Sequence, residues 1–234
     1  IYLKVFSPFL KLWDSKSSKN LDLVISNSNF VADRVRAYWG RDSLVINPCL
    51  SDKQLQIKND RINLKKNEFL FLGELTEYKK PKLAIDACID AGAILHVVGD
   101  GEQKNSLTRK YSRHKNIIFY GRVSDKNLLS FFAKCNSLIF PGIEDYGLVP
   151  LESISLGLPV IAYKKGGCLD YLDEDYSDFF NTQKVDEISK IIRQRMKKPK
   201  RINPKNIDAI KEEFAEKVFL RKFKQAILEL GIKI

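Results

Sequence analysis

The stretch from Pro141 to Glu152 holds the densest set of groups that could do chemistry. Two carboxylates, Glu144 and Glu152, flank a short glycine-containing segment that ends at Pro150. Proline is favoured at the first position of a helix, so Pro150 predicts a helix start that leaves three preceding backbone amides uncovered, those of Gly147, Leu148 and Val149. Such amides favour anions, and ionised carboxylates accept hydrogen bonds from vicinal hydroxyls. The segment, which also contains Tyr146, therefore predicts a nucleotide-sugar site.

A second candidate segment follows Leu72, where Gly73 begins a turn and Lys79 and Lys80 precede a helix started by Pro81. Lysines beside a helix N-terminus can bind phosphate oxygens, although an ordinary solvated lysine pair remains the alternative.

Two more glycine-containing segments follow predicted strands. Gly99 and Gly101 flank Asp100, and they either admit a ligand close to the backbone or simply form the turn. Gly121 is followed by Arg122 and Val123, and Arg122 is a better candidate to face a ligand than the cap-type residues after it.

Short apolar runs alternate with amphipathic stretches and predict the elements that carry these segments. Strands are expected at Phe69–Leu72, Ile94–Val98, Asn116–Tyr120, Ser137–Phe140 and Val160–Tyr163. Helices are expected at Lys82–Ala91, Gln103–Arg113, Asp125–Ala133 and Leu151–Ser155. Apolar strands joined by helices indicate a Rossmann-like, doubly wound parallel α/β sheet, whose ligands bind beyond the carboxyl ends of the strands.

The flanking regions have a different character. Residues 1–50 predict a helical opening and one βαβ unit, with strands at Asp22–Ser26 and Ser43–Ile46. Asn27-Ser28-Asn29 supplies capping residues for the helix between these strands, and Asn47-Pro48 ends the second strand. Residues 51–67 are polar and lysine-rich and predict a linker. We therefore expect a sugar-nucleotide domain over 68–200 and a helical segment over 201–234, with one helix from Pro204 to Leu230.

Composition narrows the class of protein. The net charge is +11. The four cysteines show neither close pairing nor metal-type spacing. The apolar runs are too short to cross a bilayer. We expect all four cysteines to be buried in a reducing compartment, with no metal. The basic run 197–201 predicts a solvated loop, with anionic lipid as an alternative, and nucleic acid is not expected because aromatics are not interleaved with it.

The chain resembles the C-terminal part of retaining two-domain (GT-B fold) glycosyltransferases of family four, especially bacterial mannosyltransferases of surface-polysaccharide assembly. The resemblance rests on Trp13-Asp14, Ser26-Asn27-Ser28, Gly73 with Lys79, Val98 to Gly101, Gly121 to Asp125, the Phe140 to Glu152 block, Gly157 to Tyr163 and Gly166-Gly167. The two glutamates separated by seven residues are that family's signature.

The resemblance implies the roles of the site residues, with Lys79 and Glu144 as the catalytic ones. Lys79 would hold the donor diphosphate, Glu144 with the amides of Gly147 and Leu148 the transferred sugar and its phosphate, and Glu152 the ribose. Gly99, Asp100 and the backbone around Val123 would line the nucleotide pocket, and Gly166-Gly167 would form a turn at the phosphate. No cofactor is implied; the donor, with GDP-mannose as one candidate, is a substrate.

Three departures from the family qualify this expectation. Glu74 stands where the family usually has Arg, Asp170 stands where it usually has Glu, and neither His96 nor His114 matches the family's catalytic histidine. The chain opens at Ile1, so residues 1–50 are expected to be a remnant of an acceptor domain, and the fragment alone is expected to be inactive. We expect a cytoplasmic hexosyltransferase, peripheral to the membrane, acting on a glycan or lipid-linked acceptor; a catalytically impaired binding or scaffold protein is the alternative.

Overall fold

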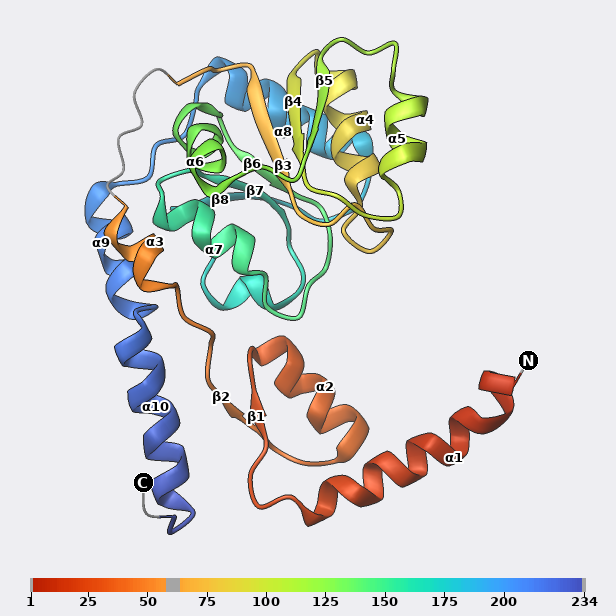
Figure 1. The fold of residues 1–234 in the computed structure, drawn as a ribbon, viewed down its shortest axis with the longest axis vertical. Coiled ribbons are helices and arrows are strands. Elements are labelled where there is room, and N and C mark those ends of the chain that lie inside the picture. Colours follow the sequence, from red (N-terminus) through yellow and green to blue (C-terminus); the bar gives the residue numbers. More distant parts are fainter. Residues whose placement is uncertain (1, 58–63, 233–234) are drawn as a thin grey trace.

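A parallel six-stranded sheet forms the centre of the computed structural model, which describes residues 2–57 and 64–232 (Figure 1). The strand order is β5-β4-β3-β6-β7-β8, and every neighbouring pair is parallel. The strands are β3 (Glu68–Leu72), β4 (Ile94–Val98), β5 (Ile117–Gly121), β6 (Leu138–Phe140), β7 (Val160–Tyr163) and β8 (Ser177–Phe180). The expected α/β class is confirmed.

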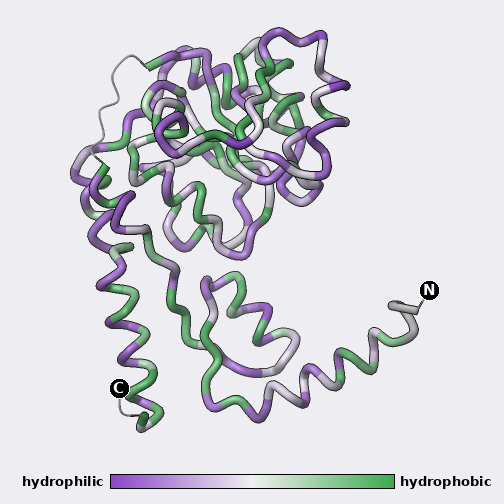
Figure 2. Tube along the Cα trace, in the orientation of Figure 1, coloured by the Kyte–Doolittle hydropathy of each residue, from purple (hydrophilic) through white to green (hydrophobic). Residues whose placement is uncertain are grey.

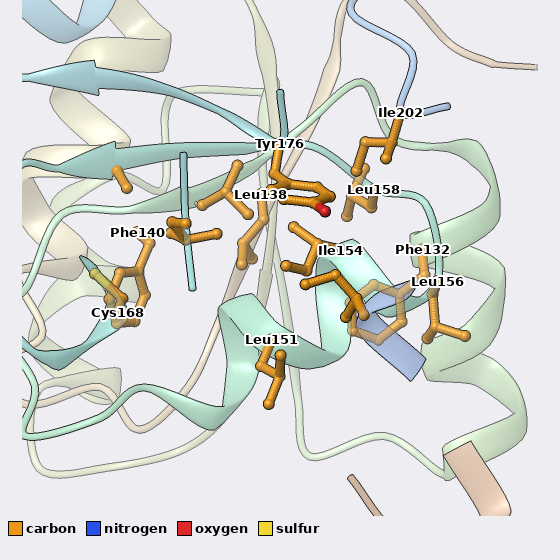
Figure 3. Packing of buried hydrophobic residues seen from close by; sticks show 14 of the residues in the cluster. Phe132, Leu138, Phe140, Leu151, Ile154, Leu156, Leu158, Cys168, Tyr176 and Ile202 are labelled. Atoms are coloured by element: carbon orange, nitrogen blue, oxygen red, sulfur yellow. The ribbon is translucent and has the colours of Figure 1, made fainter. Parts of the chain in front are cut away.

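The sheet has a separate hydrophobic core on each face, because successive side chains of a strand point to opposite faces. Phe69 and Phe71 pack on one face with α4 (Pro81–Ala91), α5 (Lys104–Lys110) and α8 (Val185–Lys197). Leu70 packs on the other face with α6 (Asp125–Lys134), α7 (Leu148–Ser155) and α9 (Pro204–Glu213). Figure 2 shows hydrophobic colour concentrated along the strands, and Figure 3 shows Leu138, Ile154, Leu158 and Tyr176 close together in the second core.

The strand order reverses between β3 and β6. From β3 the chain moves outward through β4 and β5, and it then returns to place β6 on the other side of β3. The two connections therefore leave the sheet in opposite directions and open a crevice at the carboxyl ends of β3 and β6. The segments that start at Gly73 and at Pro141 flank this crevice.

The N-terminal residues form a small unit below the sheet. It contains α1 (Tyr2–Ser17), the 3₁₀ turn η1 (Ser18–Asn20), β1 (Ile25–Ser26), α2 (Asn29–Trp39) and β2 (Leu44–Val45). β1 and β2 pair in parallel around α2, so the βαβ prediction is confirmed with shorter strands than expected. Figure 1 shows the N-terminal end of α2 directed toward the main sheet.

The expected linker contains a helix, α3 (Asp52–Gln56). The Ser51 hydroxyl accepts a hydrogen bond from the Gln54 backbone amide, and the Gln54 side-chain oxygen accepts one from the Ser51 backbone amide. This capping box was present in the sequence but lacked an apolar periodicity behind it. Residues 58–63 of the expected linker lie outside the described residues.

The C-terminal helix prediction was wrong in one respect, since α9 ends at Glu213 and α10 (Glu216–Glu229) starts anew. The break occurs because Phe214 is buried and its carbonyl accepts a hydrogen bond from Leu50 N at 2.8 Å, outside any helical ladder. The edge strand β8 was missed, since its first two residues, Ser177 and Asp178, are polar. Cys49 is partly exposed, although the other three cysteines are buried as expected.

A buried guanidinium gives the first prediction. The Arg195 side chain is 3% exposed and its Nε donates to Asp178, while Nη1 and Nη2 have no partner within the described residues. Asp178→Asn should cost about 3 kcal/mol of unfolding free energy, because it leaves a buried charge unpaired. Arg195→Met should cost much less, because Asp178 keeps Lys200 at 3.3 Å.

Chemical denaturation measures both losses. Asp90→Asn is the matched control. It removes the acid from an exposed ion pair with Arg193, which lies on α8 like Arg195. That control should lose little stability. Equal losses from Asp178→Asn and Arg195→Met would contradict the asymmetry.

Candidate functional site

The reversal between β3 and β6 opens into a recess of about 650 Å³. Lys79 lines it from the β3 segment, and residues 143–149 line it from the β6 segment. Asn27 and Pro48 contribute from the N-terminal unit. Two of these residues, Asn27 and Pro48, were not predicted, because their sequence surroundings indicated only a helix cap and a strand end.

Lys79 and Glu144 form an ion pair inside this recess. Their Nζ and Oε1 atoms are 2.9 Å apart, and the side chains are 16% and 19% exposed. Two glycines admit the lysine: a Cβ on Gly73 would lie 3.4 Å from Lys79 Cδ, and one on Gly142 would lie 2.9 Å from Lys79 Cα. The structure thus brings together the two residues expected to be catalytic, although they lie 65 positions apart in the chain.

The neighbouring lysine lies elsewhere. Lys80 has a positive φ of 56° at the N-cap of α4, pairs with Glu77 at 3.1 Å and lines a different recess. Glu74 is exposed on the same segment. Lys79 is therefore the lysine of this pair that lies in the recess.

The N-terminal end of α7 supplies the amides. The helix begins at Leu148, so Pro150 is its third residue and not its first as expected. Gly147 is the N-cap, with φ 88° and no side-chain cap, and its carbonyl accepts a hydrogen bond from the buried hydroxyl of Tyr171. The first-turn amides of Leu148 and Val149 therefore have no capping side chain at the recess.

Tyr146 closes the recess beneath these amides. Its ring is 4% exposed, and its hydroxyl donates to the Pro48 carbonyl at 3.3 Å. Burial raises the pKa of this hydroxyl above its ordinary value, which is itself well above neutral pH. Tyr146 therefore acts here as a neutral hydrogen-bond donor to the N-terminal unit.

Glu152 lies apart from Glu144. It does not line the recess, and its carboxylate accepts a hydrogen bond from the Gln54 side chain of α3. Burial is the main cause that raises the pKa of Glu152, and Gln54 partly offsets it. The two signature carboxylates thus have different surroundings: Glu144 faces a cation and Glu152 faces an amide.

The predicted glycines allow backbones to approach one another. A Cβ on Gly99 would lie 1.8 Å from the Gly73 carbonyl oxygen, and one on Gly167 would lie 1.9 Å from that of Asp145. A Cβ on Gly166 would lie 2.9 Å from the Glu144 carbonyl oxygen. Gly99, Gly166 and Gly167 therefore shape the segments around the recess rather than line it.

The remaining predicted residues follow β4 and β5. Asp100 accepts from Lys104 at 2.6 Å and from the Gly101 amide at 2.9 Å, and these contacts hold the pKa of Asp100 below its usual range. Arg122 is exposed, and Val123 is partly buried against the hydrophobic core that contains α7. The structure leaves these three residues outside the Lys79–Glu144 recess.

Two acidic residues that were not expected to act join the N-terminal unit to the site. Asp145 pairs with Arg34 of α2 at 2.5 Å. Asp170, in the 3₁₀ turn η2 (Gly167–Asp170), accepts hydrogen bonds from the Asn29 amide at 2.9 Å and from the Asn47 side chain at 3.0 Å. The sequence carried no signal for these partners, because they are more than 100 positions away.

Within residues 2–57 and 64–232, His, Cys, Asp and Glu side chains do not gather in groups of three or more that could hold a metal ion. None of the helices in that part of the chain is long and apolar enough to span a bilayer.

The partly buried carboxylate of Glu152 gives a pH-dependent prediction. Its pKa is raised in the folded state, so the unfolded chain loses this proton first as pH rises, and stability falls between the unfolded and folded pKa values. Glu152→Gln cannot ionise and should unfold at a higher temperature than the unaltered chain at pH 7. The difference should vanish near pH 4, as thermal melts at several pH values would show; a constant difference would contradict the assignment.

Sequence comparison places the chain among known proteins. A family model described as glycosyl transferases group 1 matches residues 52–213. The O-antigen biosynthesis glycosyltransferase WbnH of Escherichia coli is 30% identical over 130 residues, which cover 54% of this chain and 34% of that protein. A human alpha-1,3/1,6-mannosyltransferase is 22% identical over 89% of this chain and 59% of its own length. The chain thus spans about a third to three fifths of these relatives.

Solved structures share the fold. A sucrose-phosphate synthase from Thermosynechococcus elongatus superposes with a TM-score of 0.81 at 18% identity, over 94% of this chain and 61% of that one. HepE from Anabaena, solved in complex with UDP, gives 0.75 at 19% identity, over 88% and 64%. The chain belongs to the glycosyl transferases group 1 family, with the parallel α/β sheet of GT-B glycosyltransferases.

Proposed function

We propose that the recess binds the nucleotide-sugar donor of a retaining hexosyltransferase that acts on a glycan or lipid-linked acceptor. The observation that carries this proposal is the Lys79–Glu144 pair, which lies beside the uncapped amides of α7 in a recess at the strand-order reversal. A cation and free amides suit a diphosphate, and a carboxylate next to them suits sugar hydroxyls.

These groups match the charges that develop during sugar transfer. The bond between the anomeric carbon and the diphosphate oxygen breaks, which leaves negative charge on the diphosphate and positive charge on the sugar ring. Lys79 and the amides of Leu148 and Val149 would stabilise the leaving group, and Glu144 would orient the hexose. Groups fixed before the reaction are effective, because they need no reorganisation when charge develops.

The pair also implies an exchange of partners on binding. Without a ligand, the Lys79 ammonium is neutralised by Glu144. A bound donor offers diphosphate oxygens to Lys79 and hydroxyl donors to Glu144, so each charged group gains a replacement partner. A ligand that has only one of these two features leaves one group unpaired in a mostly buried site.

The nucleoside would extend toward the ends of β4 and β5. We propose that Gly73, Gly99, Asp100, Arg122 and Val123 line its path, with Gly166 and Gly167 supporting the β6 segment. Glu152 would bind ribose hydroxyls only after exchanging its contact with Gln54. Three carboxylates are proposed to act here: Asp100, Glu144 and Glu152. Glu144 has the most direct geometric support, because it lines the recess and pairs with Lys79.

Relatives suggest which donors to test. HepE has been solved in complex with UDP-glucose, and the human relative is a mannosyltransferase. GDP-mannose and UDP-glucose, with GDP and UDP, are therefore suitable probes. The bacterial relative is an O-antigen biosynthesis glycosyltransferase, which supports a glycan acceptor. The net charge of +11 supports a peripheral contact with anionic lipid on the cytoplasmic face.

Titration calorimetry with these four ligands tests the donor site. Lys79→Met should weaken binding of nucleoside diphosphate and nucleotide-sugar alike, by about 10- to 100-fold, because a charge-assisted contact to phosphate is lost. Glu144→Gln should weaken nucleotide-sugar binding more than nucleoside diphosphate binding. Lys82→Met, which removes an exposed lysine of α4, is the control. The absence of binding by all four ligands would contradict the proposal.

Glu74 permits a separate electrostatic test. Glu74→Arg replaces an exposed anion by a cation on the segment that carries Lys79, and should tighten UDP or GDP binding by up to about tenfold at low salt. Glu174→Arg makes the same charge change at an exposed position just before the edge strand β8 and should have little effect. If Glu74→Arg tightened binding a thousandfold or more, the native site would be impaired, which would favour the scaffold alternative.

A further inference from the structure

The hydroxyl of Ser28 joins the N-terminal unit to the recess. Ser28 is fully buried and is the N-cap of α2, where its Oγ accepts a hydrogen bond from the Val31 amide at 3.1 Å. The same Oγ donates to the carbonyl oxygen of Asp145. A hydroxyl has one proton and two lone pairs, so it can cap the helix and hold the carbonyl at once.

The carbonyl that Ser28 holds belongs to the residue after Glu144. On the other side of the same segment, the Gly167 amide donates to the Glu144 carbonyl at 2.9 Å. The lack of a side chain on Gly167 lets its backbone lie against the Asp145 carbonyl. The Glu144–Asp145 backbone is therefore held from two sides, by Ser28 and by Gly167.

Other contacts keep the N-terminal unit in place without Ser28. Asp170 binds the Asn29 amide and the Asn47 side chain, and Tyr146 donates to the Pro48 carbonyl. Loss of the Ser28 hydroxyl should therefore loosen the Glu144 segment, which keeps its contacts with Gly167 and Arg34, without detaching the unit. The consequence is specific, because the Glu144 carboxylate must stay beside Lys79 to meet the sugar.

We infer that Ser28 is a positioning residue for the transferred hexose, and that it acts through the Asp145 carbonyl on the orientation of Glu144. This inference rests on the proposed donor site. Ser28 is fully buried and does not line the recess, so its effect on the donor passes through the site backbone. Its loss should therefore reduce recognition of the sugar while the diphosphate contacts of Lys79 and the α7 amides remain.

Calorimetry on the whole chain tests this inference, with UDP against UDP-glucose and GDP against GDP-mannose. Ser28→Ala should raise the dissociation constant of the nucleotide-sugar about tenfold. The dissociation constant of the matching nucleoside diphosphate should stay within about twofold. Ser28→Thr retains a hydroxyl and should restore sugar recognition. Ser28→Gly removes the hydroxyl but keeps a residue that N-caps helices well, so it gives the same test if Ser28→Ala folds poorly.

Asn203→Ala is the matched control for loss of a cap. Asn203 caps α9 through a hydrogen bond from the Lys205 amide, and its loss should lower the melting temperature without changing sugar recognition. Equal weakening of both ligands by Ser28→Ala, or no weakening, would overturn the positioning role and leave the donor site intact. No binding of any nucleotide by the unaltered chain would overturn the donor site and this inference together.

Discussion

The reversal of strand order between β3 and β6 is the constraint on which the site depends. The two strands are neighbours in the sheet, but their connections depart in opposite directions. No helix can cover the ends of both strands, so the segments that follow them face each other across an open crevice. Lys79 and Glu144 meet there although neither has a local reason to do so.

Close packing of backbone then fixes the geometry of these segments. Gly99 lies against the Gly73 carbonyl, Gly142 lies against Lys79, and Gly167 lies against the Asp145 carbonyl. At each position a Cβ would come within 3 Å of another backbone atom, a distance that side chains do not tolerate. Gly142 thus lets the two segments of the crevice approach each other, while Gly99 and Gly167 let the segments after β4 and β7 pack against them. The groups that they position are the ones proposed to contact the ligand.

Periodicity and turn chemistry were sufficient to predict most of the sheet and the crevice, because short apolar runs between capped helices are local signals. They missed β8, whose first half is polar, and the break at Phe214, which depends on a contact with Leu50. They also assigned Ser28 only to a helix cap, since its bond to Asp145 spans 117 positions. Interactions of this kind have no signature in a single sequence.

The Lys79–Glu144 ion pair has a consequence for selectivity against abundant ions. The Glu144 carboxylate competes with any anion for Lys79, so an inorganic phosphate must displace it without giving the carboxylate a new partner. A small anion therefore gains little from this pocket, however high its concentration in a cell. In the proposed donor site, the strongest binding is expected for a molecule that brings both an acceptor for the ammonium and donors for the carboxylate.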